Sequence, residues 1–286
     1  MDTNRRGFLR HSLTILGAAA TSSAAYKAVA ATDTTMPNMA DPAQGASTSA
    51  LSPANATAGA RQGVPGRKWV MVIDLAKCDG CGKCITACSK MHFVPPDRQW
   101  IKVLRMQESE KTAPYFFPQP CYHCDNPPCT KVCPVDATFK RSDGVVLIDN
   151  ERCIGCRFCM AACPYGARSF NWGEPENPPA ALLQPYSPEQ GFPRRIGTVE
   201  KCDFCPDMAE KGMLPACTVS CPMNAIYYGD ENEDAVTNSS GETVRLSQLL
   251  LDRSGYRHME ELGTKPRVYY LPPKNRMYAP PPTIKD

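Results

Sequence analysis

Cysteine is the residue type with the clearest capacity for chemistry in this sequence. The 286 residues contain 16 cysteines, which fall into four short groups with none left over. In chain order, these quartets are Cys78, Cys81, Cys84 and Cys88; Cys121, Cys124, Cys129 and Cys133; Cys153, Cys156, Cys159 and Cys163; and Cys202, Cys205, Cys217 and Cys221. Four thiolates so close together in each group favour a site for a soft metal ion or a metal–sulfur cluster.

The spacing within the quartets indicates which metal centre is expected. Quartets one and three read C-x2-C-x2-C-x3-C, and a proline follows the last cysteine in quartets two, three and four. This spacing is typical of bacterial ferredoxins, in which it binds [4Fe–4S] clusters. Three sulfurs two residues apart let the chain curl around one cluster, while the fourth begins a short helix and points toward a second cluster. The sequence therefore predicts four [4Fe–4S] clusters.

Disulfide bridges and structural zinc are the two alternative uses of these cysteines. Exported proteins are often rich in disulfides, but a disulfide framework does not repeat one spacing with a proline after it, and bridges between cysteines three residues apart would constrain little. Structural zinc sites use two well-separated C-x2-C pairs, rather than three sulfurs within seven residues. Iron–sulfur clusters fit the pattern better than either.

The composition agrees with a protein that is held together partly by its clusters. The chain has 28 prolines, 42% hydrophobic residues and 8% aromatic residues, which predicts a loop-rich fold with a modest core. The formal net charge of +3 gives no basic excess that would indicate nucleic-acid binding. A Ser-His-Asp set, a carboxylate dyad and a phosphate-binding loop are not evident in the sequence, so we expect no catalytic residue of its own.

Short strands must position the cysteine loops. The segments 69–74 and 144–150 predict strands before quartets one and three, and residues 137–149 predict a hairpin that turns at 142–144. Further strands are expected in 167–172 and 225–230, after quartets three and four. The repeated order of strand, cysteine loop, short helix and strand predicts an α+β fold made of two tandem ferredoxin-like modules.

Other side chains near the quartets are open to two interpretations. His92 and His123 are interpreted as packing or capping residues, since each expected cluster already has four sulfurs. The cations Lys83, Arg157 and Arg168 are expected either to raise cluster potentials through their charge or simply to be solvated.

The N-terminus predicts an export signal over residues 1–30. It begins with Arg5-Arg6, continues with a short apolar run and ends in an Ala-x-Ala pattern at Ala28 to Ala30. The segment Arg-Arg-Gly-Phe-Leu-Arg resembles a twin-arginine signal, which implies export of a folded, cofactor-loaded protein to the periplasm. Residues 31–66 are rich in Ala, Thr, Ser, Pro and Gly and predict a disordered linker.

Together, the quartets resemble a known family. Quartets two, three and four are similar to motifs of the four-cluster iron–sulfur subunit of dimethyl-sulfoxide-reductase-type molybdopterin oxidoreductases. The matching segments are CYHCDNPPCTKVCP, CIGCRFCMAACPYGAR and KCDFCPDMAEKGMLPACTVSCP, and GTKPRVYYL resembles the usual ending of that subunit. The resemblance covers about residues 67–275. The first quartet is followed by Ser89 rather than proline, as is common in this family.

The resemblance implies a crossed assignment of ligands. One ferredoxin-like module would comprise 67–118 and 196–241, in which Cys78, Cys81 and Cys84 share a cluster with Cys221, while Cys202, Cys205 and Cys217 share one with Cys88. The other module would be 119–195, in which Cys121, Cys124 and Cys129 share a cluster with Cys163, and Cys153, Cys156 and Cys159 share one with Cys133. A C-terminal extension, 242–286, would pack against a module or dock on a partner.

The family's function is electron transfer rather than substrate chemistry. The resemblance implies a subunit that relays single electrons between a polytopic quinone-reactive membrane subunit and a molybdopterin catalytic subunit or a multihaem cytochrome. It also implies that these partners hold the subunit at the periplasmic side of the inner membrane. Two alternatives remain. One is a free, soluble polyferredoxin carrier, and the other is an enzyme in its own right, which would need an open coordination site or a further cofactor.

Overall fold

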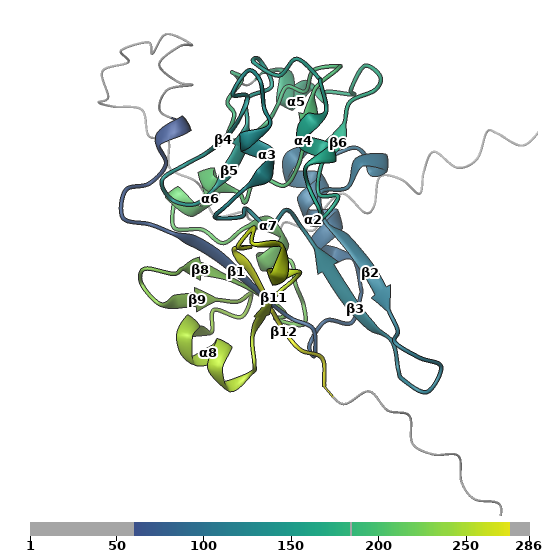
Figure 1. Ribbon diagram of the computed structural model, residues 1–286, viewed down its shortest axis with the longest axis vertical. Helices are drawn as coiled ribbons and strands as arrows, with labels where there is room; N and C mark the ends of the chain where they lie inside the picture. The colour runs from purple at the N-terminus through teal and green to yellow at the C-terminus, as the bar shows by residue number, and fades with distance from the viewer. Residues whose placement is uncertain (1–59, 184, 275–286) are drawn as a thin grey trace, which may run out of the picture. The chain divides into compact units, whose positions relative to one another are not determined.

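The computed structural model describes residues 60–183 and 185–274, and within them a mixture of short helices and strands (Figure 1). The strands are β1 (Trp69–Asp74), β2 (Lys102–Met106), β3 (Tyr115–Gln119), β4 (Thr138–Lys140), β5 (Val146–Ile148), β6 (Ser169–Phe170), β7 (Val199–Glu200), β8 (Ile226–Asp230), β9 (Ala235–Thr237), β10 (Thr243–Arg245), β11 (Tyr256–Arg257) and β12 (Val268–Leu271). The α-helices are α2 (Lys83–His92), α3 (Pro128–Lys131), α4 (Phe158–Ala161), α5 (Pro179–Leu182), α6 (Pro206–Glu210), α7 (Ala216–Val219) and α8 (Leu246–Asp252), with 3-10 turns η1 (Pro96–Arg98) and η2 (Glu260–Leu262). This content confirms the α+β class.

The largest sheet has six strands in the order β10-β9-β8-β1-β12-β11. Strand β1 pairs antiparallel with β8 and parallel with β12, so residues near both ends of the described chain meet at the centre of the sheet. Strands β10, β11 and β12 come from the expected C-terminal extension, which therefore completes this sheet rather than lying beside it.

Strand β1 divides the core into two layers. Met71 and Ile73 face a large cluster of buried residues that includes cysteines of several quartets. Val70 and Val72 point to the opposite face, where they pack with Leu246 of α8. The alternation of side chains along a strand thus puts one face of the sheet against the cysteine loops and the other against α8 (Figure 1).

The other strands form three small antiparallel pairs, which are β2–β3, β4–β5 and β6–β7. Residues 138–140 and 146–148 form the expected hairpin, in which Thr138 lies opposite Ile148. The expected strands at 69–74 and 225–230 also form, as β1 and β8. Among the described residues, no helix is both long and apolar enough to cross a lipid bilayer.

The expected linker ends earlier than the sequence predicts. Residues 60–62 are helical, Ala60 is buried, and the Val64 backbone N–H donates to Asp143 Oδ2 at 3.1 Å. The prediction of disorder is therefore wrong for residues 60–66, because contacts with a distant hairpin order a segment that has little apolar surface of its own. The export signal and residues 31–59 lie outside the described part of the chain.

Candidate iron–sulfur sites

Three of the described cavities are each lined by four cysteines. In each cavity, three of the cysteines belong to one quartet and the fourth is the last cysteine of another. The first cavity, of about 330 Å³, is lined by Cys78, Cys81, Cys84 and Cys221. The second, of about 350 Å³, is lined by Cys121, Cys124, Cys129 and Cys163. The third, of about 280 Å³, is lined by Cys153, Cys156, Cys159 and Cys133. Apolar side chains and prolines make up much of the remaining lining.

The other four cysteines form an enclosed group. Cys88, Cys202, Cys205 and Cys217 are all buried. Burial raises the pKa of the Cys205 thiol well above its usual range, and charge on Asp203, Cys217, Cys202 and Cys88 raises it further. This set again joins three cysteines of one quartet with the last cysteine of another, and α2, which carries Cys88, contacts α7, which carries Cys217.

The donor sets have the chemistry that an iron–sulfur cluster needs. Burial raises the pKa of Cys84 and of Cys124 to about 12, and that of Cys217 to about 11, so these thiols keep their protons in the absence of metal. A bound cation reverses this preference, since coordination removes the thiol proton. Thiolate quartets in cavities with little polar lining therefore fit cubane clusters.

Backbone N–H groups also approach the sulfurs. Ala137 N donates to Cys133 Sγ at 3.2 Å, and Ala225 N donates to Cys221 Sγ at 3.3 Å. In both quartets the donor lies four residues after the last cysteine, beyond the Cys-Pro turn. Such N–H···S contacts stabilise the more negative, reduced state of a cluster.

His123 has the packing role that the sequence suggests. It is buried, stacks on Phe204 at 4.3 Å and donates from Nε2 to the Cys202 carbonyl oxygen at 3.0 Å, while Nδ1 accepts from Val146 N at 3.0 Å. Burial, together with the charge of Lys201, lowers the pKa of His123 well below its usual range, which agrees with a neutral ring that both donates and accepts.

His92 is not only a packing residue. Its Nε2 lies 3.2 Å from Cys205 Sγ, so the interpretation from sequence misses a direct contact with a candidate ligand. His92 and Cys205 are 113 positions apart in the chain, and the spacing of cysteines within a quartet says nothing about contacts over that separation.

The three cations expected near the quartets differ in their surroundings. Lys83 and Arg157 are exposed, and Arg157 lies over the Trp172 ring at 4.6 Å. Arg168 is buried, and its Nη1 donates to Thr138 Oγ1 at 3.2 Å. Although burial alone lowers it, the pKa of Arg168 is raised overall by charge on cysteines of quartets two and three. Arg157 lines the cavity of Cys153, Cys156, Cys159 and Cys133, but of the three cations only Arg168 is buried, so its charge is the least screened by water.

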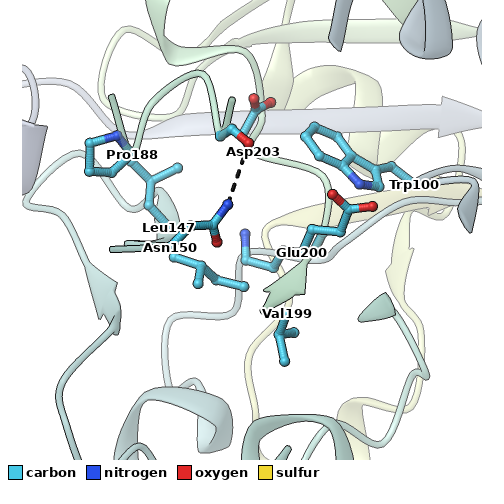
Figure 2. A pocket seen from close by; sticks show the side chains of 10 residues that line it. Trp100, Leu147, Asn150, Pro188, Val199, Glu200 and Asp203 are labelled. Carbon is cyan, nitrogen blue, oxygen red and sulfur yellow. Dashed lines mark hydrogen bonds between the residues drawn. The ribbon is translucent and has the colours of Figure 1, made fainter. Parts of the chain in front are cut away.

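A further cavity of about 280 Å³ adjoins quartet four (Figure 2). Figure 2 shows Trp100, Asn150, Glu200 and Asp203 among the side chains around it. The lining contains no thiol, hydroxyl side chain or imidazole, and its one amine, Lys201 Nζ, donates to the Cys202 carbonyl oxygen at 2.8 Å. Glu200 Oε2 accepts from Arg194 Nε at 2.6 Å, whereas Trp100 Nε1, Asn150 Oδ1 and Glu200 Oε1 are buried without a hydrogen-bond partner among the described residues.

Comparisons with known proteins agree with the cysteine geometry. Two models described as a 4Fe-4S dicluster domain match the chain, one over residues 60–137 and the other over residues 112–177 and 185–231. With 16 cysteines available to them, these domains give the protein four [4Fe–4S] clusters.

Several curated proteins are similar over most of their length. A selenate reductase subunit of Mesobacillus selenatarsenatis is 43% identical over 71% of this chain and 72% of its own. A tetrathionate reductase subunit of Salmonella typhimurium is 35% identical over 73% and 74%, and the menaquinone reductase iron–sulfur cluster-binding subunit of Nitratidesulfovibrio vulgaris is 35% identical over 71% and 88%. The chain therefore belongs to the family of 4Fe–4S dicluster proteins that provides the iron–sulfur subunits of molybdopterin reductases and related quinone-linked complexes.

Proposed function

We propose that the 16 cysteines hold the four clusters in the crossed sets that line the cavities and the enclosed group. The clusters are named here A, D, B and C. Cluster A is held by Cys78, Cys81, Cys84 and Cys221; cluster D by Cys202, Cys205, Cys217 and Cys88; cluster B by Cys121, Cys124, Cys129 and Cys163; and cluster C by Cys153, Cys156, Cys159 and Cys133. Clusters A and D then form one ferredoxin-like module, and B and C a second in tandem.

The observation that carries the proposed function is that each set lies beside the next. Helix α2 carries both Cys84 of set A and Cys88 of set D. His123, which lies between Cys121 and Cys124 of set B, donates to the carbonyl oxygen of Cys202 of set D at 3.0 Å. Helix α3, which carries Cys129 of set B, contacts α4, which carries Cys159 of set C. The order A–D–B–C is therefore continuous, which is the requirement for a chain of cofactors that relays single electrons from one end to the other.

The protein is a relay subunit of a respiratory complex in this proposal. Its relatives' names include reductases and a menaquinone-linked complex, which supports a quinone-reactive membrane subunit at one end and a molybdopterin catalytic subunit or a cytochrome at the other. The Arg5-Arg6 pair supports twin-arginine export and a periplasmic location. Residues 67–118 with 196–241 and residues 119–195 are the proposed modules.

The direct test is anaerobic purification from native membranes, followed by iron analysis, redox-titrated EPR and identification of bound subunits. We expect about 16 irons per chain, four cubane signals and a co-purified membrane subunit. A chain released alone with full iron would instead support the soluble polyferredoxin carrier. Far fewer irons would contradict the ligand sets.

Serine variants test the crossing itself. Cys221→Ser is expected to alter the same EPR signal as Cys78→Ser and to leave intact the signal altered by Cys217→Ser, although Cys217 and Cys221 share a quartet. If Cys221→Ser and Cys217→Ser alter one common signal and Cys78→Ser another, each quartet holds its own cluster and the crossed assignment is wrong.

A further inference from the structure

Helix α2 carries three inward-facing groups at equal spacing. Cys84, Cys88 and His92 lie four residues apart, so they share one face of the helix, and all three are buried. Cys84 belongs to set A and Cys88 to set D. His92, one turn farther on, continues this row toward Cys205, and its Nε2 lies 3.2 Å from Cys205 Sγ.

The ring and the main chain of His92 are both held in place. Its Nδ1 lies 3.2 Å from Asp203 Oδ2, and its face packs against Trp100 at a centroid distance of 5.1 Å. The Arg194 guanidinium donates to the carbonyl oxygens of His92 at 2.6 Å and Phe93 at 2.7 Å, which fixes the end of α2. His92 is only 3% exposed, so water does not screen the contact with sulfur.

The chemistry of a cluster ligand determines the direction of this contact. A sulfur bound to iron is a thiolate and can only accept a hydrogen bond, so Nε2 must carry the proton and donate it. We propose that His92 sets the reduction potential of cluster D by donating its Nε2–H to Cys205 Sγ. The inference rests on the ligand set proposed above for cluster D.

The expected effect has a definite sign. Reduction adds one negative charge to the cluster and its sulfurs, so a donor to Cys205 Sγ binds the reduced state more strongly than the oxidised state. His92 therefore raises the potential of cluster D. Loss of the donor is expected to shift the reduction equilibrium of this one cluster by about tenfold toward the oxidised state, which corresponds to about 59 mV for one electron.

Two amide variants separate this role from packing. The side chain of His92→Gln can place an N–H near the former Nε2, whereas His92→Asn places one only near the former Nδ1, beside Asp203. In the full complex, we expect His92→Asn to lower one of the four midpoint potentials, and His92→Gln to keep that potential close to the parent value. His258→Asn is the matched control, since the ring contacts of His258 are with Phe117, Tyr122, Tyr165 and Tyr270.

Pulsed EPR on the unmodified protein gives a second readout that does not depend on how variants fold. We expect the reduced cluster D to show coupling to an imidazole nitrogen and to an exchangeable proton. In His92→Gln, the imidazole coupling should disappear while the coupling to an exchangeable proton remains. Any of three results would overturn the role of His92. These are four unchanged potentials in a His92→Asn complex with full iron, equal shifts of the potential in both amide variants, and no imidazole coupling in the parent protein.

Failure of the ligand set gives a different result. His92, Asp203 and Cys205 place donor atoms within 4.8 Å of one another, a spacing that could also hold a single metal ion. About 12 irons per chain with a separate metal ion at these residues would refute cluster D itself, and with it both the proposed ligand set and the inference.

Discussion

Arg141 is the site at which a single substitution should weaken the protein most clearly. Its side chain is 0% exposed and forms ion pairs with Asp143 at 2.7 Å, Glu189 at 2.5 Å and Glu210 at 2.7 Å. Arg141 follows strand β4, whereas Glu210 belongs to α6, just after Cys205. The guanidinium therefore ties the hairpin beside sets B and C to the helix beside set D. We predict that Arg141→Met destabilises this junction.

The expected loss follows from the burial of the partners. Asp143 is also 0% exposed, so Arg141→Met leaves it as a buried carboxylate without its cation, a change that costs about 3–5 kcal/mol. Asp143 keeps hydrogen bonds from Val64 N at 3.1 Å and Val145 N at 3.2 Å, which favours the lower end, about 3 kcal/mol. For a domain of this size, that corresponds to a fall of about 6–12 °C in the thermal midpoint.

The assay is loss of cluster absorbance during an anaerobic thermal ramp at a fixed scan rate. Arg245→Met is the matched control, because Arg245 is 80% exposed and pairs with Asp234 at 3.0 Å, an interaction worth about 1 kcal/mol or less. Replacing both buried partners, as in Arg141→Met with Asp143→Asn, should restore part of the loss. If Arg141→Met and Arg245→Met melt at the same temperature, the reasoning from burial is refuted.

Three further predictions concern the clusters. Anaerobic removal of iron should unfold the chain, seen as loss of far-UV ellipticity and rapid proteolysis, because the clusters join segments that the modest core does not hold together by itself. An iron-free chain with native ellipticity would contradict this. Arg168→Met should lower the potentials of two clusters, B and C, by on the order of 59 mV each. Arg157 lines the cavity of cluster C but is exposed to water, so Arg157→Met should shift that potential much less; equal effects would show that burial is irrelevant. Gly155→Ala should reduce the iron content by about four irons per chain, since its Cβ would overlap the Gly197 carbonyl oxygen. Gly82→Ala should keep its full iron content, because nothing lies within 4 Å of the new Cβ. Full iron in both variants would refute the steric argument.

The fold was predictable where the signal is local. The apolar run from Trp69 to Ile73 and the turn at Ser142 to Gly144 indicate β1 and the β4–β5 hairpin, because strand propensity and turn chemistry are properties of neighbouring residues. The place of the C-terminal extension in the sheet could not be predicted in this way. Tyr269 and its neighbours in β12 pair in parallel with β1 from a distant part of the chain, and no local pattern specifies which strand lies beside which.

The sequence by itself determined the chemistry of this protein, because the spacing of cysteines along a short loop decides how many sulfurs can reach one cluster. Only the tertiary structure decided what surrounds those sulfurs. It brought His92 to Cys205, buried Arg168 beside the cysteines of quartets two and three, and ordered residues 60–66 against Asp143. These contacts join residues far apart in the chain, and their presence depends on how the elements pack rather than on any pattern within one of them.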